Sequence, residues 1–304
     1  MKRILQIFVI MLIATGCGKK YPIPPEPTTG GLPPLGSYVK DINWPGSDLN
    51  YQDIKDVIVG KDGFIYVLDG AMVHKLLITG EEVGTITAPQ NMEAIAQDEE
   101  RNIYFAGIDS VIHVVSRGGE WRTLTPPDSL CNLCGITVSN EIYISDTLSD
   151  VVLGFIPDSN VVDTIARFGN GALYVDNPLD LWMDPLGRVL TVSFNHNWVE
   201  AFPTDSTIPF LHLGGDNPDG DTIEGKFYMP VDVVSDDSGY IYVADSFRIQ
   251  KFDELGNFVT DVIFEDERPV SVAITDDGKY LIVATRTQLY KFERFDGLQQ
   301  GGGY

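Results

Sequence analysis

One unit of sequence recurs six times between residues 53 and 297, and such a repeat constrains the fold more than any local signal. Each unit has an apolar strand, a tight turn, a second strand of the type Ile-Tyr-Val, a polar loop, and third and fourth strands. The matching residues of the six second strands are Tyr66, Tyr104, Tyr143, Leu190, Tyr242 and Ile282, spaced by 38, 39, 47, 52 and 40 residues. We therefore expect four-stranded units of about 43 residues.

Turn residues and composition both favour an all-β fold. Lys61-Asp62-Gly63 and Asp277-Gly278 lie between first and second strands, where tight hairpins need residues that tolerate positive φ. The 30 glycines and 18 prolines also interrupt the chain too often for long helices. Six units of four antiparallel strands predict a six-bladed β-propeller, because radial closure protects most strand edges.

The fifth unit carries the most specific signal. Residues 225–234, 239–246 and 248–253 together resemble an NHL repeat, and weaker echoes of it occur at Asp146-Thr147 and Asn195-His196. The resemblance implies a six-bladed propeller. It also implies a binding face for partners or ligands where the second strands end and the chain enters the first strands.

The sixth unit has no convincing fourth strand after its third strand at residues 288–292. Residues 37–42 alternate like a strand and are similar to residues 257–262, the fourth strand of the fifth unit. We expect residues 38–42 to pair with the outer edge of the C-terminal blade, so that an N-terminal strand closes the ring. The propeller is then expected to span residues 37–297, followed by a flexible tail at 298–304.

The start of the chain has the pattern of a cleaved signal. Two basic residues precede an apolar run at residues 4–13, which is shorter than the roughly 20 residues of a transmembrane helix. Small residues at 14–16 directly precede Cys17, which is similar to the lipobox of bacterial lipoproteins, whose cysteine carries acyl chains. We expect a signal peptide at residues 1–16 and lipidation of Cys17. The alternative is an ordinary secretory signal with an incidental cysteine.

Residues 17–36 are rich in proline and glycine and predict an extended tether. The chain has 44 acidic and 21 basic residues, a formal net charge of −23, which makes nucleic acid an unsuitable partner. Two basic residues leave with the signal peptide, so 19 remain against 44 acidic residues, or −25, and an anionic membrane repels the mature domain. We expect a monomer in the cell envelope, held by lipid at an outer membrane or the cell surface.

Carboxylates recur at one position of the aligned innermost strands. The six residues at this position are Asp56, Glu93, Gly135, Asp180, Asp232 and Ser271. Innermost strands begin near the mouth of the channel, so these side chains can converge, and like charges then raise one another's pKa. Oxygen-only ligands favour Ca²⁺ or Mg²⁺. The alternative is that each carboxylate accepts backbone N–H groups of its own loop.

A second polar set follows the second strands. Asp69, Asp146 and Asp245 end three of these strands, and the related or following residues are Ser193, Thr285, Asp150, Asn195, His196, Arg248 and Arg286. All of them are expected on one face, where the aspartates and Arg248 are candidates to bind a ligand or cation. The alternative is that the aspartates hold their loops through Asx-type hydrogen bonds.

Other sites with possible chemistry are weaker. Cys131 and Cys134 in an exported protein leave a short-loop disulfide and two buried thiols both open. Residues 216–221 with Glu224 miss the register of a calcium loop, so we expect a solvated loop. The histidines do not repeat at one inner position, unlike the metal-holding histidines of peptide-amidating lyases; they are His74, His113, His196 and His212.

These features predict a non-enzymatic binding module for a protein, peptide or glycan, with no certain cofactor. The alternative is a calcium-dependent hydrolase or lyase similar to the gluconolactonase and regucalcin-type propellers. Its metal ligands or bases would be Asp56, Glu93, Asp180 and Asp232. No Ser/His/Asp order, phosphate loop or nucleotide fingerprint stands in a credible context.

Overall fold

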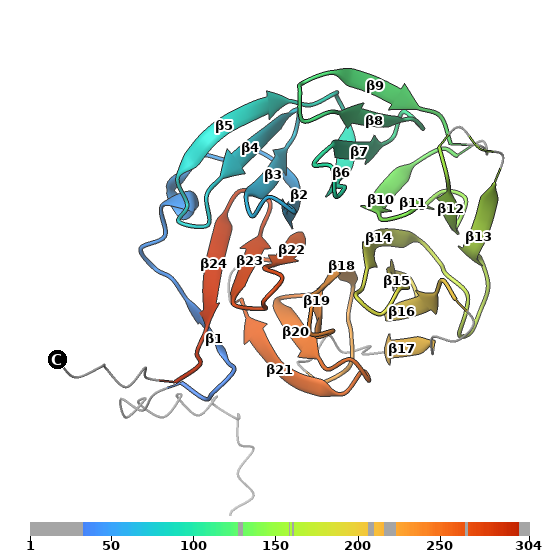
Figure 1. Ribbon diagram of the computed structural model, residues 1–304. Coiled ribbons are helices and arrows are strands. Elements are labelled where there is room, and N and C mark those ends of the chain that lie inside the picture. The colour runs from blue at the N-terminus through green and yellow to red at the C-terminus, as the bar shows by residue number, and fades with distance from the viewer. Residues whose placement is uncertain are drawn as a thin grey trace, which may run out of the picture. The chain divides into compact units, whose positions relative to one another are not determined.

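The computed structural model describes residues 33–297, except residues 127–129, 158, 160, 206–209, 216–222 and 265–266. Its strands form six four-stranded antiparallel sheets arranged in a ring (Figure 1). The domain is an all-β six-bladed propeller, which confirms the predicted fold class. Among these described residues the helical element is one short 3-10 helix, η1 at Pro45–Asp48. None of the described helices is long and apolar enough to cross a membrane.

The first five blades each contain four consecutive strands, ordered from the channel to the rim. Blade 1 has β2 (Ile54–Val59), β3 (Ile65–Asp69), β4 (Met72–Leu76) and β5 (Glu82–Thr87). Blade 2 has β6 (Met92–Gln97), β7 (Ile103–Gly107), β8 (Ile112–Val115) and β9 (Trp121–Leu124). Blade 3 has β10 (Leu133–Val138), β11 (Ile142–Asp146), β12 (Val151–Phe155) and β13 (Val162–Arg167).

The second half of the ring repeats this pattern. Blade 4 has β14 (Pro178–Met183), β15 (Arg188–Ser193), β16 (Trp198–Pro203) and β17 (Leu211–Gly214). Blade 5 has β18 (Pro230–Ser235), β19 (Ile241–Asp245), β20 (Arg248–Phe252) and β21 (Phe258–Ile263). Blade 6 combines β22 (Ser271–Ile274), β23 (Tyr280–Ala284) and β24 (Leu289–Arg294) with β1 (Tyr38–Lys40) from the start of the domain.

The N-terminal strand β1 closes the ring. It pairs antiparallel with β24, with Tyr38 opposite Arg294. The Tyr38 hydroxyl donates to the Gly278 carbonyl at 2.6 Å and lies 2.9 Å from the Tyr242 hydroxyl of blade 5. The predicted closure is therefore confirmed, and the closing strand is tied to two blades at once.

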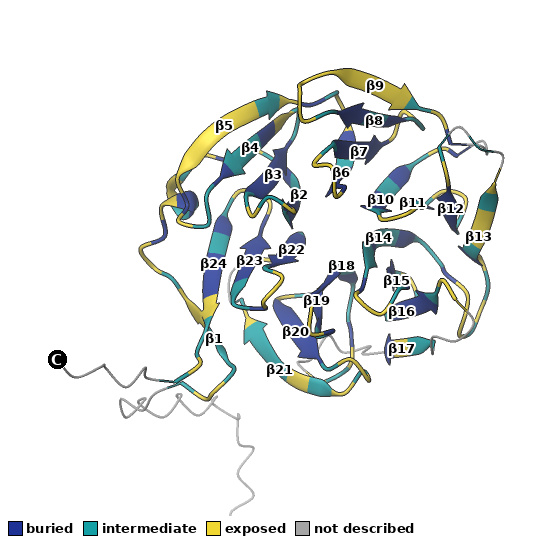
Figure 2. Cartoon of the chain, viewed as in Figure 1, coloured by how far each residue is buried: buried dark blue, intermediate teal, exposed yellow. Residues whose placement is uncertain are grey.

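Apolar side chains fill the spaces between neighbouring blades. One cluster joins Val67 of blade 1 to Ala273 and Ile282 of blade 6. Second strands such as β3 and β19 are buried throughout, whereas the rim strand β5 is mostly exposed (Figure 2). Because both faces of a second strand pack against other blades, it is a continuous apolar run, as in the repeated Ile-Tyr-Val.

Candidate functional site

Three aspartates link neighbouring blades near the start of the innermost strands. Each accepts a backbone N–H from the innermost strand of the next blade: Asp56 from Ile95 at 2.8 Å, Asp180 from Val233 at 3.1 Å, and Asp232 from Val272 at 2.6 Å. An innermost strand has no further strand on its channel side, so its N–H groups need other acceptors. The carboxylates supply them and act as clasps between blades.

Ser271 links blades 6 and 1 in a related way, and at Gly135 two blades approach without a side-chain link from that position. Ser271 Oγ accepts the Val57 N–H of blade 1 at 3.0 Å and donates to Asp56 Oδ1 at 2.9 Å. A Cβ added to Gly135 would lie 2.8 Å from the Asp180 Cα, so blades 3 and 4 approach too closely there for a side chain. The carboxylates thus accept backbone N–H groups, as the alternative interpretation held, but important donors lie in the next blade.

Burial changes the protonation of the three aspartates. Burial, and then the charge of Asp232, raises the pKa of Asp56 to about 7 and raises the pKa of Asp180 well above its usual range. Burial also raises the pKa of Asp232, although its hydrogen bond with Asp180 favours the ionised form. Burial and the charge of Asp232 therefore both favour the protonated form of Asp180.

Glu93 does not belong to this cluster. A β-bulge near the start of the innermost strand adds one residue, which is Glu93 in blade 2. Asp56 pairs with Leu68 and Ala94 with Ala106, each the penultimate residue of a second strand, so Ala94 is the residue equivalent to Asp56. The alignment predicted from sequence is wrong at Glu93.

The bulge position carries its own ion pair. Lys55 lies in the bulge of blade 1, and its Nζ is 3.3 Å from a carboxylate oxygen of Glu93 and 3.4 Å from one of Asp53. Glu93 therefore faces a cation of the neighbouring blade. Within the described residues, no group of three or more His, Cys, Asp or Glu side chains is arranged to hold a metal ion.

The aspartates that end second strands hold the loops that lead into the first strands. The backbone N–H donors are Gln52 (3.0 Å) and Asp53 (2.6 Å) to Asp69, Cys131 (2.7 Å) to Asp146, and Tyr228 to Asp245. In blade 4 the hydroxyl of Ser193 accepts the Asp176 N–H at 2.9 Å, and Thr285 Oγ1 accepts the Gln288 N–H of its own loop at 3.2 Å. The set gathers on one face, as expected, and its described contacts are structural.

Arg248 is also part of the framework. Its side chain is buried, and its Nε donates to Asp245 at 3.1 Å. One terminal nitrogen donates to the carbonyls of Ile223 and Lys226 at 2.9 and 2.8 Å. The guanidinium therefore fastens the loop before β18.

The remaining polar candidates have local partners. Their contacts are Asn195 to Asp176 (2.6 Å), Asp150 to the Asn177 N–H (2.7 Å), Arg286 to Asp53 (2.7 Å), His196 to Ser193 (2.9 Å), His74 to Glu82 (2.7 Å), His113 to Asp109 (2.7 Å) and His212 to Glu200 (3.2 Å). Each of the four histidines pairs within its own blade. His196 and His212 both contact Trp198 in blade 4, whereas His74 and His113 lie apart in blades 1 and 2.

Cys131 and Cys134 are free thiols in the structure, but Cys131 is exposed and Cys134 half-buried, so they are not the two buried thiols that sequence left open. Cys134 Sγ lies 3.6 Å from Thr147 Oγ1, and burial raises the pKa of its thiol. An unreactive, protonated thiol is expected there at neutral pH. Cys17, most of the tether, residues 216–221 and the tail lie outside the described residues.

A cavity of about 410 Å³ occupies the channel. It extends from Asp56 and Asp180 to the hairpin turns between first and second strands, where Lys61, Glu99 and Asp237 are exposed. Because first and second strands are antiparallel, these turns lie at the opposite end from the face that carries Asp69 and its equivalents. The cavity therefore opens away from the face on which sequence predicted a ligand.

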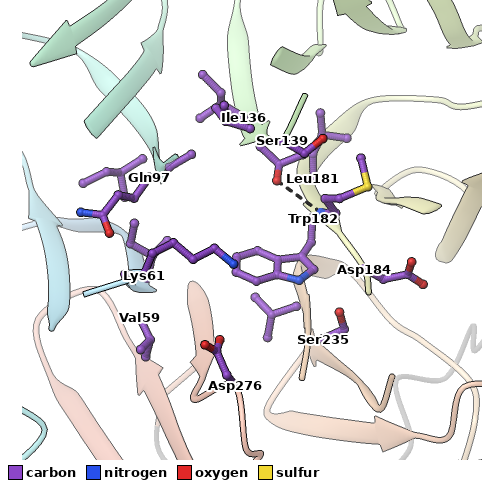
Figure 3. A pocket seen from close by; sticks show the side chains of 18 of the residues that line it. Val59, Lys61, Gln97, Ile136, Ser139, Leu181, Trp182, Asp184, Ser235 and Asp276 are labelled. Atoms are coloured by element: carbon purple, nitrogen blue, oxygen red, sulfur yellow. Dashed lines mark hydrogen bonds between the residues drawn. The ribbon is translucent and has the colours of Figure 1, made fainter. Parts of the chain in front are cut away.

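Trp182 breaks the symmetry of the cavity wall. The equivalent residues of the other innermost strands are smaller: Ile58, Ala96, Thr137, Val234 and Ala273. Its indole lies in the cavity near Ser235 and Asp276 (Figure 3). Sequence analysis missed this residue, although one aromatic at an otherwise small or aliphatic repeat position was a usable signal.

Comparisons with known proteins support NHL-like repeats in part of the chain. No family model matches it. A stretch of 120 residues is 37% identical to NHL repeat-containing protein 3 of Homo sapiens, covering 37% of this chain and 33% of that protein. The Mus musculus protein of that name is 36% identical over 134 residues, covering 41% and 37%. The chain thus spans only about a third of the length of these relatives.

Solved structures match over most of the propeller. A gluconolactonase from Xanthomonas campestris superposes with a TM-score of 0.60 at 12% identity, covering 86% of this chain and 99% of that one. A virginiamycin B lyase from Staphylococcus aureus gives 0.57 at 10% identity, covering 84% and 98%. At these identities the likeness shows the propeller fold alone.

Proposed function

We propose that this protein is an exported lipoprotein whose propeller binds a protein, peptide or glycan in the cell envelope. The lipobox-like sequence before Cys17 and the tether at residues 17–36 support a lipid anchor at an outer membrane or the cell surface. Stable anchoring by lipid takes more than one acyl chain, as lipoprotein cysteines carry.

The main support for a binding role is that the carboxylates serve as acceptors for backbone N–H groups. The clasps of the ring and the aspartates that end second strands all accept backbone N–H groups, so they hold strands and loops together. The cavity, by contrast, is open at the hairpin turns and has an indole in its wall. A concave site with an apolar wall and a few polar groups is typical of ligand binding.

A calcium-dependent hydrolase or lyase is the second candidate. The observation in its favour is that Asp56 and Asp180 line one end of the cavity and both interact electrostatically with the neighbouring Asp232. A hard cation needs several free oxygen ligands, but each of the three carboxylates already accepts a backbone N–H, and no group of three or more His, Cys, Asp or Glu side chains among the described residues is arranged to hold a metal ion. The residues present do not fit a calcium ion, so we derive no metal-dependent step.

Thermal melting separates the two candidates. Millimolar calcium and excess EDTA, at matched ionic strength, should give the same melting temperature for the wild-type protein. Stabilisation by calcium that is lost in both Asp180→Asn and Asp232→Asn would contradict the binding role and support the metal-dependent enzyme.

Metabolic labelling tests the anchor. In a bacterial host that processes lipoproteins, the wild-type chain should incorporate a palmitate analogue and pellet with membranes. Cys17→Ser should do neither, whereas Cys131→Ser should behave like wild type. Labelling that persists in Cys17→Ser would refute lipidation at this cysteine.

A further inference from the structure

We propose that the cavity at the hairpin turns binds an organic cation, an ammonium or guanidinium group attached to an apolar chain. Such a group belongs to a free amine or to a lysine or arginine side chain of a peptide. The inference rests on the proposed binding function and adds the chemical class of the ligand.

Acidic side chains outnumber cations at the mouth of the cavity, where Lys61 faces four carboxylates. The mouth is formed by exposed residues of four hairpin turns: Lys61, Glu99, Glu100, Asp237 and Asp276. Among these five mouth residues, which the structure describes, one ion pair forms: Lys61 Nζ lies 3.5 Å from Glu99 Oε1. Burial and then the charge of Asp237 raise the pKa of Asp276, a sign of repulsion that a bound cation would relieve.

The indole of Trp182 supplies the apolar wall for such a ligand. An ammonium or guanidinium group is attracted to an indole face by the quadrupole of the ring, and the guanidinium also stacks on it. In Figure 3 the side chain of Lys61 extends across the cavity with its amino end toward Trp182, and Asp276 lies on the same side. The Lys61 amino group pairs with Glu99 at 3.5 Å, so a bound cation would compete with this lysine for the acidic groups of the mouth.

Two buried polar groups that line the cavity have no partner among the described residues. The Ser235 hydroxyl belongs to a side chain that is 6% exposed, and its oxygen points to the Trp182 side of the cavity in Figure 3. Both amide atoms of Gln97, which is 7% exposed, are also unpaired. Unpaired buried polar groups are costly, and N–H groups of a guanidinium or peptide can supply the partner that the serine lacks.

Isothermal titration calorimetry on the detergent-solubilised full-length protein tests the proposal with four probes. They are agmatine, Gly-Arg-Gly amide, Gly-citrulline-Gly amide and an N-acetylglucosamine tetramer. Citrulline has the shape of arginine without its charge, so we expect it to bind at least about tenfold more weakly than the arginine peptide. If agmatine binds as tightly as the arginine peptide, a free amine is a sufficient ligand. If the peptide binds more tightly, the ligand is a peptide segment. Both results support recognition of a cation.

Variants locate the binding in the cavity. Trp182→Leu should weaken the arginine peptide about tenfold, whereas Trp121→Leu on the rim should not. Asp276→Asn and Asp237→Asn should each weaken it several-fold, whereas the exposed rim variant Asp163→Asn, with the same change of charge, should not. Lys61→Met should bind it more tightly, because a competing cation is gone. Near-UV circular dichroism verifies that each variant is folded.

Several outcomes would overturn the proposal. Equal affinity for the citrulline peptide, full affinity in Trp182→Leu, or weaker binding in Lys61→Met would each show that the cavity does not recognise a cation. Binding of the N-acetylglucosamine tetramer alone would also refute the cation while leaving the binding module in place. Binding of no probe refutes the cation too, and the calcium melting experiment then judges the proposed function separately.

Discussion

Asp180 shows how burial favours the neutral form of a carboxyl group that still links two blades by a hydrogen bond. One of its oxygens accepts the Val233 N–H, and burial and then the charge of Asp232 raise its pKa well above the usual range. An ionised Asp180 would place a second negative charge beside Asp232 in a poorly solvated site. The protonated form avoids that repulsion and still joins blades 4 and 5.

The raised pKa of Asp180 makes stability depend on pH in a defined direction. Below the unfolded value of 3.8 both states are protonated, and the stabilisation is fully present. As pH rises toward the folded pKa, the unfolded chain ionises first, so the stabilisation is progressively lost. Asp180→Asn keeps the acceptor and the donor and never ionises. We expect it to change the free energy of unfolding by less than about 0.5 kcal/mol near pH 4 and to raise it by about 1–3 kcal/mol at pH 8.

Urea denaturation at the two pH values measures this difference. Asp163→Asn removes the same charge from the exposed strand β13 and should have little effect at either pH. If Asp180→Asn instead destabilised the protein equally at pH 4 and pH 8, the pKa of the wild-type Asp180 carboxyl would not be raised.

At the scale of elements, the repeat in the sequence predicted where the strands lie, but it did not predict the residue pairing between strands. The second strands were predictable because burial on both faces leaves an apolar run, as in Ile65–Asp69. The closing strand was predictable because residues 37–42 resemble a fourth strand. Glu93 was misplaced because a bulge shifts pairing by one residue without changing the apolar pattern.

The closing strand is held by the hydroxyl of Tyr38, whose contacts can be removed by deleting a single oxygen atom. Tyr38→Phe deletes the hydroxyl that donates to the Gly278 carbonyl and contacts Tyr242, so we expect a loss of about 1–2 kcal/mol in the free energy of unfolding. Tyr240→Phe is the matched control, because the Tyr240 hydroxyl forms no hydrogen bond with the part of the chain that the structure describes. Chemical denaturation of both variants measures the effect.

Removal of residues 37–43 should cost much more than Tyr38→Phe, because all pairing between β1 and β24 is lost. An unchanged melting temperature after this deletion would show that the ring does not depend on β1. A neutral Tyr38→Phe with a damaging deletion would assign the closure to backbone pairing alone.

At the scale of the whole molecule, the position and lining of the cavity could not be predicted from the sequence of a single repeat. Its wall is built from residues of several blades, such as Lys61, Gln97, Trp182 and Ser235, and its position follows from the ring. The sequence indicated that carboxylates recur near the start of the innermost strands. It could not show that they bind backbone N–H groups of the next blade, because that contact requires the distance between blades.

The net charge of the chain affects stability as a property of the whole fold. A formal charge of −23 repels itself in the compact state, and exposed ion pairs such as Lys61 with Glu99 offset little of this repulsion. Salt at about 0.15 M shortens the range of this repulsion to about 8 Å. Raising sodium chloride from about 0.01 M should therefore increase the melting temperature by about 2–5 °C. Scanning calorimetry at neutral pH measures the shift, with magnesium and calcium compared at equal ionic strength. A falling melting temperature would show that exposed ion pairs outweigh the repulsion, whereas a rise specific to calcium would point to a bound ion instead of screening.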